Sequence, residues 1–303
     1  MTAARAPGTV LVTGATGLIG RPTVAALAAR GFSVLAASRS GGVVAGGQAV
    51  AMDCLDRASV RAAVGRHQPT HLLHLAWADG PARWSSAENL AWVGASLDLL
   101  ADFAAAGGTR AVLVGSCAEY DWTRADGPLA EDAAIAPATL YGAAKAATGL
   151  AARAGAGALG LSLAWARPFF LYGPGEPEGR LAGDLVRGLR EGREVPCTDG
   201  LQKRDFLYAG DVADALAALL ASPVEGVVNI GSGRAVPVRY LIASIAAAMA
   251  REAQVRLGAK PRPANDPPLI EADVTRLTVE VGFRPAHDLK TGVRAMLAAE
   301  GVL

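Results

Sequence analysis

Short apolar runs alternate along the first half of the chain with longer stretches whose apolar residues recur every three to four positions. Runs of this length rich in Val, Leu and Ala are typical of buried β-strands, and the longer stretches are typical of amphipathic helices. The predicted strands are Val10–Thr13, Ser33–Ser38, Ala49–Met52, His71–Leu75, Ala111–Gly115 and Leu161–Ala166, and the predicted helices lie near 18–30, 56–66, 85–106 and 138–154. This alternation predicts an α/β fold, a doubly wound parallel sheet with ligands at the carboxyl ends of its strands.

A glycine-rich turn connects the first predicted strand to the first predicted helix. Its sequence, Thr13-Gly14-Ala15-Thr16-Gly17-Leu18-Ile19-Gly20, has the spacing G-x-x-G-x-x-G. The first glycine permits a tight turn, the second lets the backbone approach a pyrophosphate, and the third lets helix and strand pack closely. Free amides at the helix N-terminus favour an anion. We therefore predict a Rossmann-type dinucleotide site with cofactor contacts from Gly14, Thr16, Gly17, Leu18, Ile19 and Gly20.

The pattern changes after Arg167-Pro168. Gly173–Pro177 is a loop, Pro261–Pro268 is a second proline-rich passage, and mixed short elements lie between them. The run Val227–Gly231 predicts one more strand that returns to the main sheet. We expect a dinucleotide-binding domain made of residues 1–172 and about 206–232, and a smaller, discontinuous substrate-binding domain made of residues 173–205 and 233–303.

Composition and charge narrow the class of protein. A chain of 303 residues with 51% apolar content can bury a full core. A net charge of +1 argues against nucleic acid or a membrane surface as the main partner. Cys54, Cys117 and Cys197 lie far apart without metal-ligand spacing, so we predict no metal site and a reducing compartment. No apolar run approaches 18 residues, and residues 1–5 lack the apolar core of a signal peptide. We expect a soluble cytoplasmic protein.

Tyr141 and Lys145 lie one helical turn apart on a predicted helix, and Ser116 follows the fifth predicted strand. A phenol is a poor proton donor near neutrality unless its pKa falls from about 10. A lysine at i+4 favours the phenolate and so lowers that pKa. The pair is interpreted as a general acid and the group that tunes it, with the hydroxyl of Ser116 available to polarise a carbonyl.

Five motifs occur in order along nearly the whole chain: the glycine turn at 13–20, Ser116, Tyr141 with Lys145, Tyr172–Gly175 and Arg204–Phe206. Together they resemble an extended short-chain dehydrogenase/reductase of the NAD(P)-dependent epimerase/dehydratase type. Such proteins act mostly on nucleotide-diphosphate sugars. The resemblance implies that Tyr141 is the catalytic acid/base, that Lys145 bonds the nicotinamide ribose and that Ser116 polarises the substrate carbonyl.

The same resemblance implies further contacts. Arg204 and Arg262 match the arginines that clamp the substrate diphosphate, a task suited to a planar bidentate donor. The other expected cofactor contacts are Arg39, Asp53, Leu75 and Ala76, and the other expected substrate contacts are Cys117 and Phe170.

The residues after Ser116 discriminate among the reactions of the family. Relatives that dehydrate a sugar carry Asp and Glu at the next two positions, which here are Cys117 and Ala118. Neither side chain can donate or abstract the required protons, although Glu119 lies one residue further. The sequence therefore argues against a dehydratase.

The end of the second strand bears on the choice of cofactor. It reads Ala37-Ser38-Arg39-Ser40, without the carboxylate that bonds the ribose 2′-hydroxyl of NAD. Arg39 with its flanking hydroxyls suits a 2′-phosphate. We predict NADP, with NAD possible; that Arg39 stacks on the adenine or points to solvent stays open. A cofactor that arrives reduced favours a net reductase over an epimerase.

Several residues depart from the family pattern or stay open. Phe170 stands where many relatives have an Asn that helps to bind the diphosphate, so either the donors differ or the substrate is not a standard nucleotide sugar. Trp77 replaces a small residue near the cofactor and either narrows the pocket or packs. Trp84 and Trp122 either stack on a sugar or base or pack at the surface. His74 is interpreted as a buried histidine with a backbone partner rather than as a catalytic group.

The C-terminal half resembles bacterial 4-ketoreductases of deoxysugar pathways, of the CDP-abequose synthase type, at Gly200–Leu207, Asp211–Val212 and Leu257–Ala259. That resemblance implies NADP(H)-dependent reduction of a 4-keto group on a nucleotide-linked deoxysugar. Two alternatives stay open: a nucleotide-sugar 4-epimerase with tightly bound NAD, and a non-catalytic dinucleotide-binding sensor or scaffold. The helices at Leu90–Ala106 and Leu140–Ala152 form a homodimer interface in the family, so we predict a homodimer; alternatively they only cover the sheet.

Overall fold

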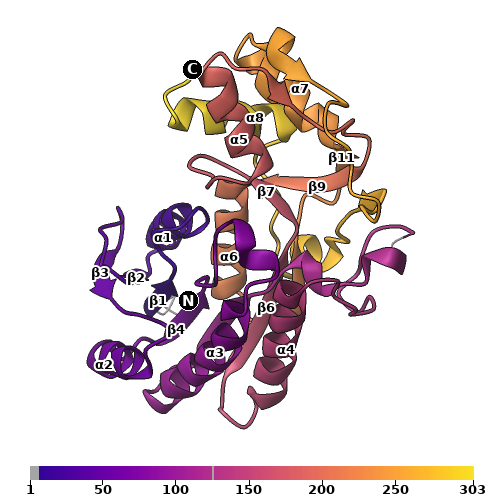
Figure 1. The fold of residues 1–303 in the computed structure, drawn as a ribbon. Helices are drawn as coiled ribbons and strands as arrows, with labels where there is room; N and C mark the ends of the chain where they lie inside the picture. Colours follow the sequence, from indigo (N-terminus) through magenta and orange to yellow (C-terminus); the bar gives the residue numbers. More distant parts are fainter. Residues whose placement is uncertain (1–6, 125) are drawn as a thin grey trace.

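Seven parallel strands form the main sheet of the protein. A computed structural model describes residues 7–124 and 126–303, so the stretch 1–5, judged above not to be a signal peptide, lies outside the described residues. The strand order is β10-β6-β5-β4-β1-β2-β3 (Figure 1). The strands are β1 (Thr9–Thr13), β2 (Ser33–Ser38), β3 (Gln48–Ala51), β4 (His71–His74), β5 (Arg110–Val114), β6 (Ser162–Pro168) and β10 (Gly226–Ile230). The predicted doubly wound parallel sheet is confirmed, including the strand that returns from the C-terminal half.

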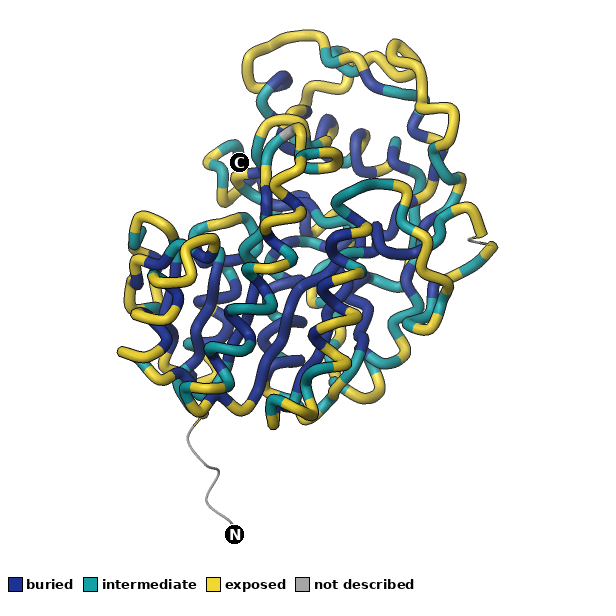
Figure 2. The backbone as a smooth tube through the Cα atoms, turned by 60° about the horizontal axis from the view of Figure 1, so that its bottom comes forward, coloured by how far each residue is buried: buried dark blue, intermediate teal, exposed yellow. Residues whose placement is uncertain are grey.

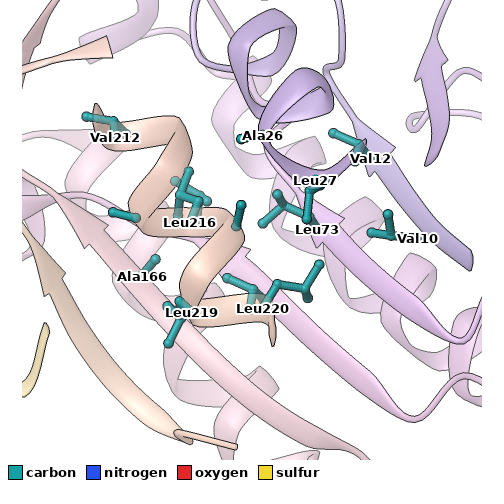
Figure 3. Packing of buried hydrophobic residues seen from close by; sticks show 14 of the residues in the cluster. Val10, Val12, Ala26, Leu27, Leu73, Ala166, Val212, Leu216, Leu219 and Leu220 are labelled. Carbon is teal, nitrogen blue, oxygen red and sulfur yellow. The ribbon is translucent and has the colours of Figure 1, made fainter. Parts of the chain in front are cut away.

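Helices cover both faces of this sheet. One face carries α1 (Gly20–Ala29) and α6 (Ala209–Ala221), and the other carries α2 (Arg57–His67), α3 (Glu88–Ala105) and α4 (Leu140–Gly155). Alternate strand residues point to opposite faces, and in Figure 3 Leu216 and Leu220 of α6 lie beside α1 and β4. The strands are buried and the outer sides of the helices are exposed (Figure 2). Burial on both faces explains why the strands are continuous apolar runs.

A second, smaller sheet begins directly after β6. It contains β7 (Phe170–Tyr172), β9 (Lys203–Tyr208), β11 (Ala235–Pro237) and β13 (Leu269–Ile270), while β8 (Val195–Pro196) pairs with β12 (Val255–Arg256). The helices α5 (Leu181–Arg190), α7 (Val238–Ala248) and α8 (Leu289–Ala299) share a separate apolar core at this end of the molecule (Figure 1). Because β7 pairs with β9, the chain leaves the main sheet after Pro168, and it returns to that sheet with α6 and β10.

The strand order reverses between β1 and β4, because β1 pairs with β2 on one side and with β4 on the other. In sheets of this kind ligands bind in the crevice outside the carboxyl ends of the strands at such a reversal. The glycine turn follows β1 and therefore lies at this crevice.

Candidate active site

The glycine turn is shaped by close backbone approaches. Gly14 has φ +67°, and a Cβ there would lie 2.9 Å from the amide nitrogen of Ala76. A Cβ at Gly20 would lie 2.1 Å from the carbonyl oxygen of Gly14. A side chain at either position would push the turn away from β4 or from α1. The turn also borders a cavity of about 180 Å³ that reaches the loop at Pro174 and Gly175.

Thr13 ties the ends of β1 and β4 together. Its hydroxyl oxygen accepts the amides of Leu75 at 3.1 Å and Ala76 at 3.2 Å, and bonds His74 Nδ1 at 2.7 Å. His74 Nε2 bonds the Ser96 hydroxyl at 2.9 Å, and burial lowers the pKa of His74 to about 3. His74 is thus a neutral, fully bonded histidine, as interpreted from the sequence, although its partners are side-chain hydroxyls rather than a backbone group.

The expected cofactor contacts beyond the turn follow neighbouring strands. Arg39 comes directly after β2, Asp53 follows β3, and Leu75 and Ala76 follow β4. Parallel strands place their carboxyl ends at one edge, so these residues share the edge with the glycine turn. Arg39 is exposed, and Asp53 accepts the amide of Leu55 at 3.0 Å.

Ser116 and Tyr141 meet where α4 packs on the loop after β5. A Cβ at Gly142 would lie 2.2 Å from the carbonyl oxygen of Ala118, so the first turn of α4 rests directly on this loop. Thr139 caps the helix by accepting the amide of Gly142 at 3.1 Å. Burial raises the pKa of Tyr141 to about 12, and a hydrogen bond with the Ser116 side chain opposes the rise. The phenol is therefore protonated at neutral pH.

Lys145 lies one turn further along α4 and is 3% exposed. Its Nζ donates to the carbonyl oxygen of Val114 at 2.7 Å and lies 3.7 Å from the ring centroid of Trp77. Burial lowers the pKa of Lys145 to about 7, opposed by the charge of Glu119.

The expectation that Lys145 lowers the pKa of Tyr141 is corrected at this point. The groups that shift this pKa after burial are Ser116, Cys117, Arg180 and Glu119. The ammonium is turned instead toward a carbonyl and an indole ring, because the lysine side chain follows the packed side of α4. In this structure, the hydrogen bond that lowers the pKa of the phenol comes from Ser116.

Glu119 is a structural carboxylate. It is fully buried, accepts the amide of Ser116 at 2.8 Å and the indole N–H of Trp165 at 3.0 and 3.1 Å, and pairs with Arg167 at 2.7 Å. These bonds occupy both oxygens, so the residue is not available for proton transfer. Cys117 is also buried, which raises the pKa of its thiol. The structure therefore agrees with the argument against a dehydratase.

The arginines expected to clamp a diphosphate are both paired with carboxylates. Arg204 is 5% exposed, pairs with Asp266 and donates to the carbonyl of Pro267 at 2.8 Å. Arg262 lies 3.8 Å from Asp199. Burial lowers the pKa of Arg204, and the nearby carboxylate of Asp266 raises it. The positive charge of Arg262 also lowers the pKa of Arg204, so the two guanidinium groups lie close enough to repel each other.

Phe170 joins an aromatic cluster beside Arg204. The Arg204 guanidinium carbon lies 5.4 Å from the centroid of the Phe170 ring. The Phe170 ring lies 6.3 Å from that of Trp122 and 6.1 Å from that of Phe206, between centroids. Trp122 also donates to the carbonyl of Cys117 at 2.8 Å. Phe170 thus replaces a polar contact by packing, and Trp122 packs here.

The profile of the NAD dependent epimerase/dehydratase family matches residues 10–231. The chain belongs to this family. It is 29% identical to the dTDP-4-dehydro-6-deoxy-D-allose reductase of Streptomyces bikiniensis, over 97% of this chain and 96% of that enzyme. It is 26% identical to UDP-glucuronate 4-epimerase 5 of Arabidopsis thaliana, over 94% of this chain and 74% of the relative. The solved structure of MoeE5 with UDP-glucose and NAD superposes with a TM-score of 0.83 at 28% identity, covering 96% of this chain and 98% of that one.

Membership of the epimerase/dehydratase family makes the protein an NAD(P)-dependent enzyme, an oxidoreductase or an epimerase. The sensor or scaffold alternative is therefore set aside. Among residues 7–124 and 126–303, no helix is both long enough and apolar enough to cross a bilayer.

Three residues beside Tyr141 were missed by sequence reasoning or left open. Trp84 lies edge-on to Tyr141, with ring centroids 5.3 Å apart, and Arg83 lies over Trp84 at 4.7 Å. Arg180, which caps α5, lowers the pKa of Tyr141, and within the described chain its buried Nε has no hydrogen-bond partner. The position of Arg180 in the sequence could have indicated it, because Arg180 ends the loop that begins with the motif Tyr172–Gly175.

Proposed function

We propose that the protein reduces a 4-keto group on a nucleotide-linked deoxysugar with NADPH. The observation that carries the proposal is the protonated Tyr141 phenol, whose pKa the Ser116 side chain lowers against the rise caused by burial, while the nearby carboxylate of Glu119 is paired with Arg167. Such a site can donate a proton to a developing alkoxide but has no second acid or base with which to eliminate water. The 29% identical reductase supports a ketone as substrate.

In this mechanism the bound nicotinamide supplies the hydride to C4 of the sugar. Ser116 donates a hydrogen bond to the carbonyl oxygen, and Tyr141 delivers its proton as negative charge develops there. Lys145 bonds the nicotinamide ribose. Fixing these groups before the substrate arrives lowers the barrier, because positioning is worth about 7–11 kcal/mol in well-oriented systems.

The residues present fit a dinucleotide. Gly14 and Gly20 let the turn pack closely against Ala76 and against the start of α1, where the backbone amides of the helix N-terminus would hold a pyrophosphate. Arg39 directly follows β2 and is exposed. We assign it the contact with a 2′-phosphate, which makes NADP the preferred cofactor. We assign Asp53 the contact with the adenine. The remaining cofactor contacts are proposed at Thr16, Leu18, Ile19, Leu75 and Ala76.

We assign the substrate to the side of the crevice formed by residues 173–205 and 233–303. Arg204 and Arg262 contact the diphosphate of the substrate after releasing Asp266 and Asp199, their present partners. Cys117 and Phe170 line the site of the sugar. The larger part, 1–172 with about 206–232, holds the cofactor.

A homodimer and a cytoplasmic location complete the proposal. Leu90 on α3 and Leu150 on α4 are 62% and 66% exposed, as expected of a helix pair that a second copy would cover. The three cysteines are free and buried, which suits a reducing compartment. Sedimentation that gives only a monomer mass would refute the dimer.

The deciding experiment separates reductase from epimerase. Purified protein is denatured and its released nucleotide is identified, and NADPH oxidation is then followed with dTDP- and CDP-linked 4-keto-6-deoxyhexoses. A reductase releases little nucleotide and consumes NADPH stoichiometrically with product. Retained NAD together with interconversion of 4-epimers of a nucleotide sugar, without net NADPH consumption, would establish the epimerase suggested by the 26% identical relative.

A further inference from the structure

Trp77 makes a contact that its packing role does not require. Its ring centroid lies 3.7 Å from Lys145 Nζ, whose one other bond among the described residues goes to the carbonyl of Val114. An ammonium buried to this extent needs compensation, because desolvation disfavours its charged form. A tryptophan face is the strongest aromatic partner for a cation. Trp77 therefore stabilises the protonated lysine and fixes the position of its nitrogen.

The indole of Trp77 is itself held rigidly. Its Nε1 donates to Asn89 Oδ1 at 2.8 Å, and its ring stacks on Trp92 with centroids 5.9 Å apart and planes inclined by 27°. Asn89 is fully buried, and its Nδ2 donates to the carbonyls of Arg83 at 2.7 Å and Ser86 at 2.8 Å. One amide thus joins the tryptophan to the loop that follows it.

That loop reaches the other catalytic side chain. Trp84 lies edge-on to Tyr141, with ring planes inclined by 80°. The segment 77–89 therefore contacts Lys145 at one end and Tyr141 near the other, with Asn89 bonded to both parts.

We propose that Trp77 is a positioning residue: it keeps the Lys145 side chain protonated and holds its nitrogen in place relative to Tyr141. We also propose that the segment 77–89 positions the side chains of Lys145 and Tyr141 together. The assignment rests on the roles given to Tyr141 and Lys145 in the proposed function. It extends that function, since it names a residue that acts through Lys145 without touching substrate.

Few groups besides Trp77 favour the charged form of Lys145. His74 on β4 is neutral, because burial lowers its pKa to about 3. Glu119, in the loop after β5, raises the pKa of Lys145, but its own charge is paired with that of Arg167. Tyr141 on the same helix is protonated. Removing the indole face therefore removes a group that favours the ammonium, and the pKa of Lys145 falls below about 7.

Nuclear magnetic resonance of lysine side chains tests this directly, because the chain has four lysines: Lys145, Lys203, Lys260 and Lys290. Protein labelled with ¹³C-lysine is titrated across about pH 5 to 9, a range that brackets the value expected for Lys145. The Lys145 signal is assigned by its loss in Lys145→Arg. The variants are Trp77→Leu, which removes the ring, and Trp77→Phe, which keeps an aromatic face. Phe103→Leu is the control, because it alters the same apolar cluster near the C-terminal end of α3.

We expect the Lys145 midpoint to fall in Trp77→Leu, to recover partly in Trp77→Phe and to stay unchanged in Phe103→Leu. Affinity for the nicotinamide cofactor at neutral pH, measured by fluorescence, should fall about tenfold in Trp77→Leu, the size expected of a desolvated cation–π contact. A Lys145 midpoint in Trp77→Leu equal to that of the unaltered protein would overturn the proposal.

A fluorinated tryptophan introduced at position 77 covers the case in which Trp77→Leu fails to fold. Fluorine withdraws charge from the ring face while keeping its shape and N–H, so the Lys145 midpoint should still fall; an unchanged midpoint would overturn the proposal. These readouts do not involve the sugar. A shifted midpoint in a protein that reduces no nucleotide sugar would therefore reject the proposed function and leave the role of Trp77 intact.

Discussion

The two sides of the crevice reach their functional side chains in opposite ways. On the cofactor side, Ser116 and Tyr141 are brought together by backbone packing, with Gly142 resting on the loop after β5. On the substrate side, Arg204 and Arg262 are each held by an aspartate, Asp266 and Asp199. In the proposed function, the proton-donating site is therefore already assembled, whereas the two arginines must release their aspartates in order to bind the diphosphate.

This difference follows from the chemistry each side needs. A proton donor works best when its geometry costs nothing at the moment of reaction. A buried cation, in contrast, is costly without a counter-ion, so Arg204 pairs with Asp266. In the proposed function, a diphosphate takes the place of that carboxylate. An incoming diphosphate must compete with that carboxylate, which favours ligands that carry more charge than one carboxylate.

The largest effect is expected at the assembled side. Tyr141→Phe removes the proton that Tyr141 delivers and keeps the ring against Trp84, so turnover should fall about 10³-fold, within the range for loss of a general acid. Cofactor affinity should stay nearly unchanged. Turnover is measured by NADPH oxidation, and cofactor affinity by fluorescence titration. Unchanged turnover in Tyr141→Phe would show that Tyr141 is not the proton donor.

Glu119→Gln should lower the stability of the fold around Ser116 and Tyr141 rather than remove a group that takes part in the reaction. It leaves Arg167 buried without its counter-charge, so the free energy of unfolding should fall by about 3–5 kcal/mol, measured by urea denaturation. Glu194→Gln is the control, because its exposed pair with Arg256 should contribute less than about 1 kcal/mol. A stable Glu119→Gln protein without turnover would show that Glu119 is catalytic.

Arg204→Leu and Asp266→Asn should move substrate binding in opposite directions. Loss of the Arg204 guanidinium should raise KM for the nucleotide sugar about tenfold, the usual size of one charged hydrogen bond, with kcat little changed. Loss of the competing carboxylate in Asp266→Asn should lower KM severalfold. If Asp266→Asn raises KM as much as Arg204→Leu does, the pair is structural and the exchange of partners is wrong.

Arg39 differs from Arg204 and Arg262, which are paired with aspartates. It is exposed, and within residues 7–124 and 126–303 it forms no ion pair. An arginine without a competing carboxylate should bind an anion without exchange. Arg39→Leu should weaken NADPH about fivefold to tenfold and leave NADH unaltered, as expected when one exposed phosphate contact is lost. Equal loss for the two cofactors would place Arg39 against the adenine instead.

Much of this architecture could be predicted from the sequence. All six predicted strands occur within two residues of their expected ends, because burial on both faces keeps the central strands rich in apolar residues. The pairing of Phe170–Tyr172 with β9 could not be predicted, because it joins two strands that lie far apart in the sequence. Local patterns carry no information about which distant strand a short run joins.

The sequence by itself determined the sheet and the glycine turn, since each depends on periodicity or on glycine geometry, and the family resemblance indicated that Ser116 and Tyr141 act together. The tertiary structure decided where the charges are neutralised. Lys145 turns to Val114 and Trp77, Glu119 to Arg167, and Arg204 to Asp266. Buried charges take whichever partners the packed fold brings within a few ångströms, and helical spacing along one segment does not reveal those partners.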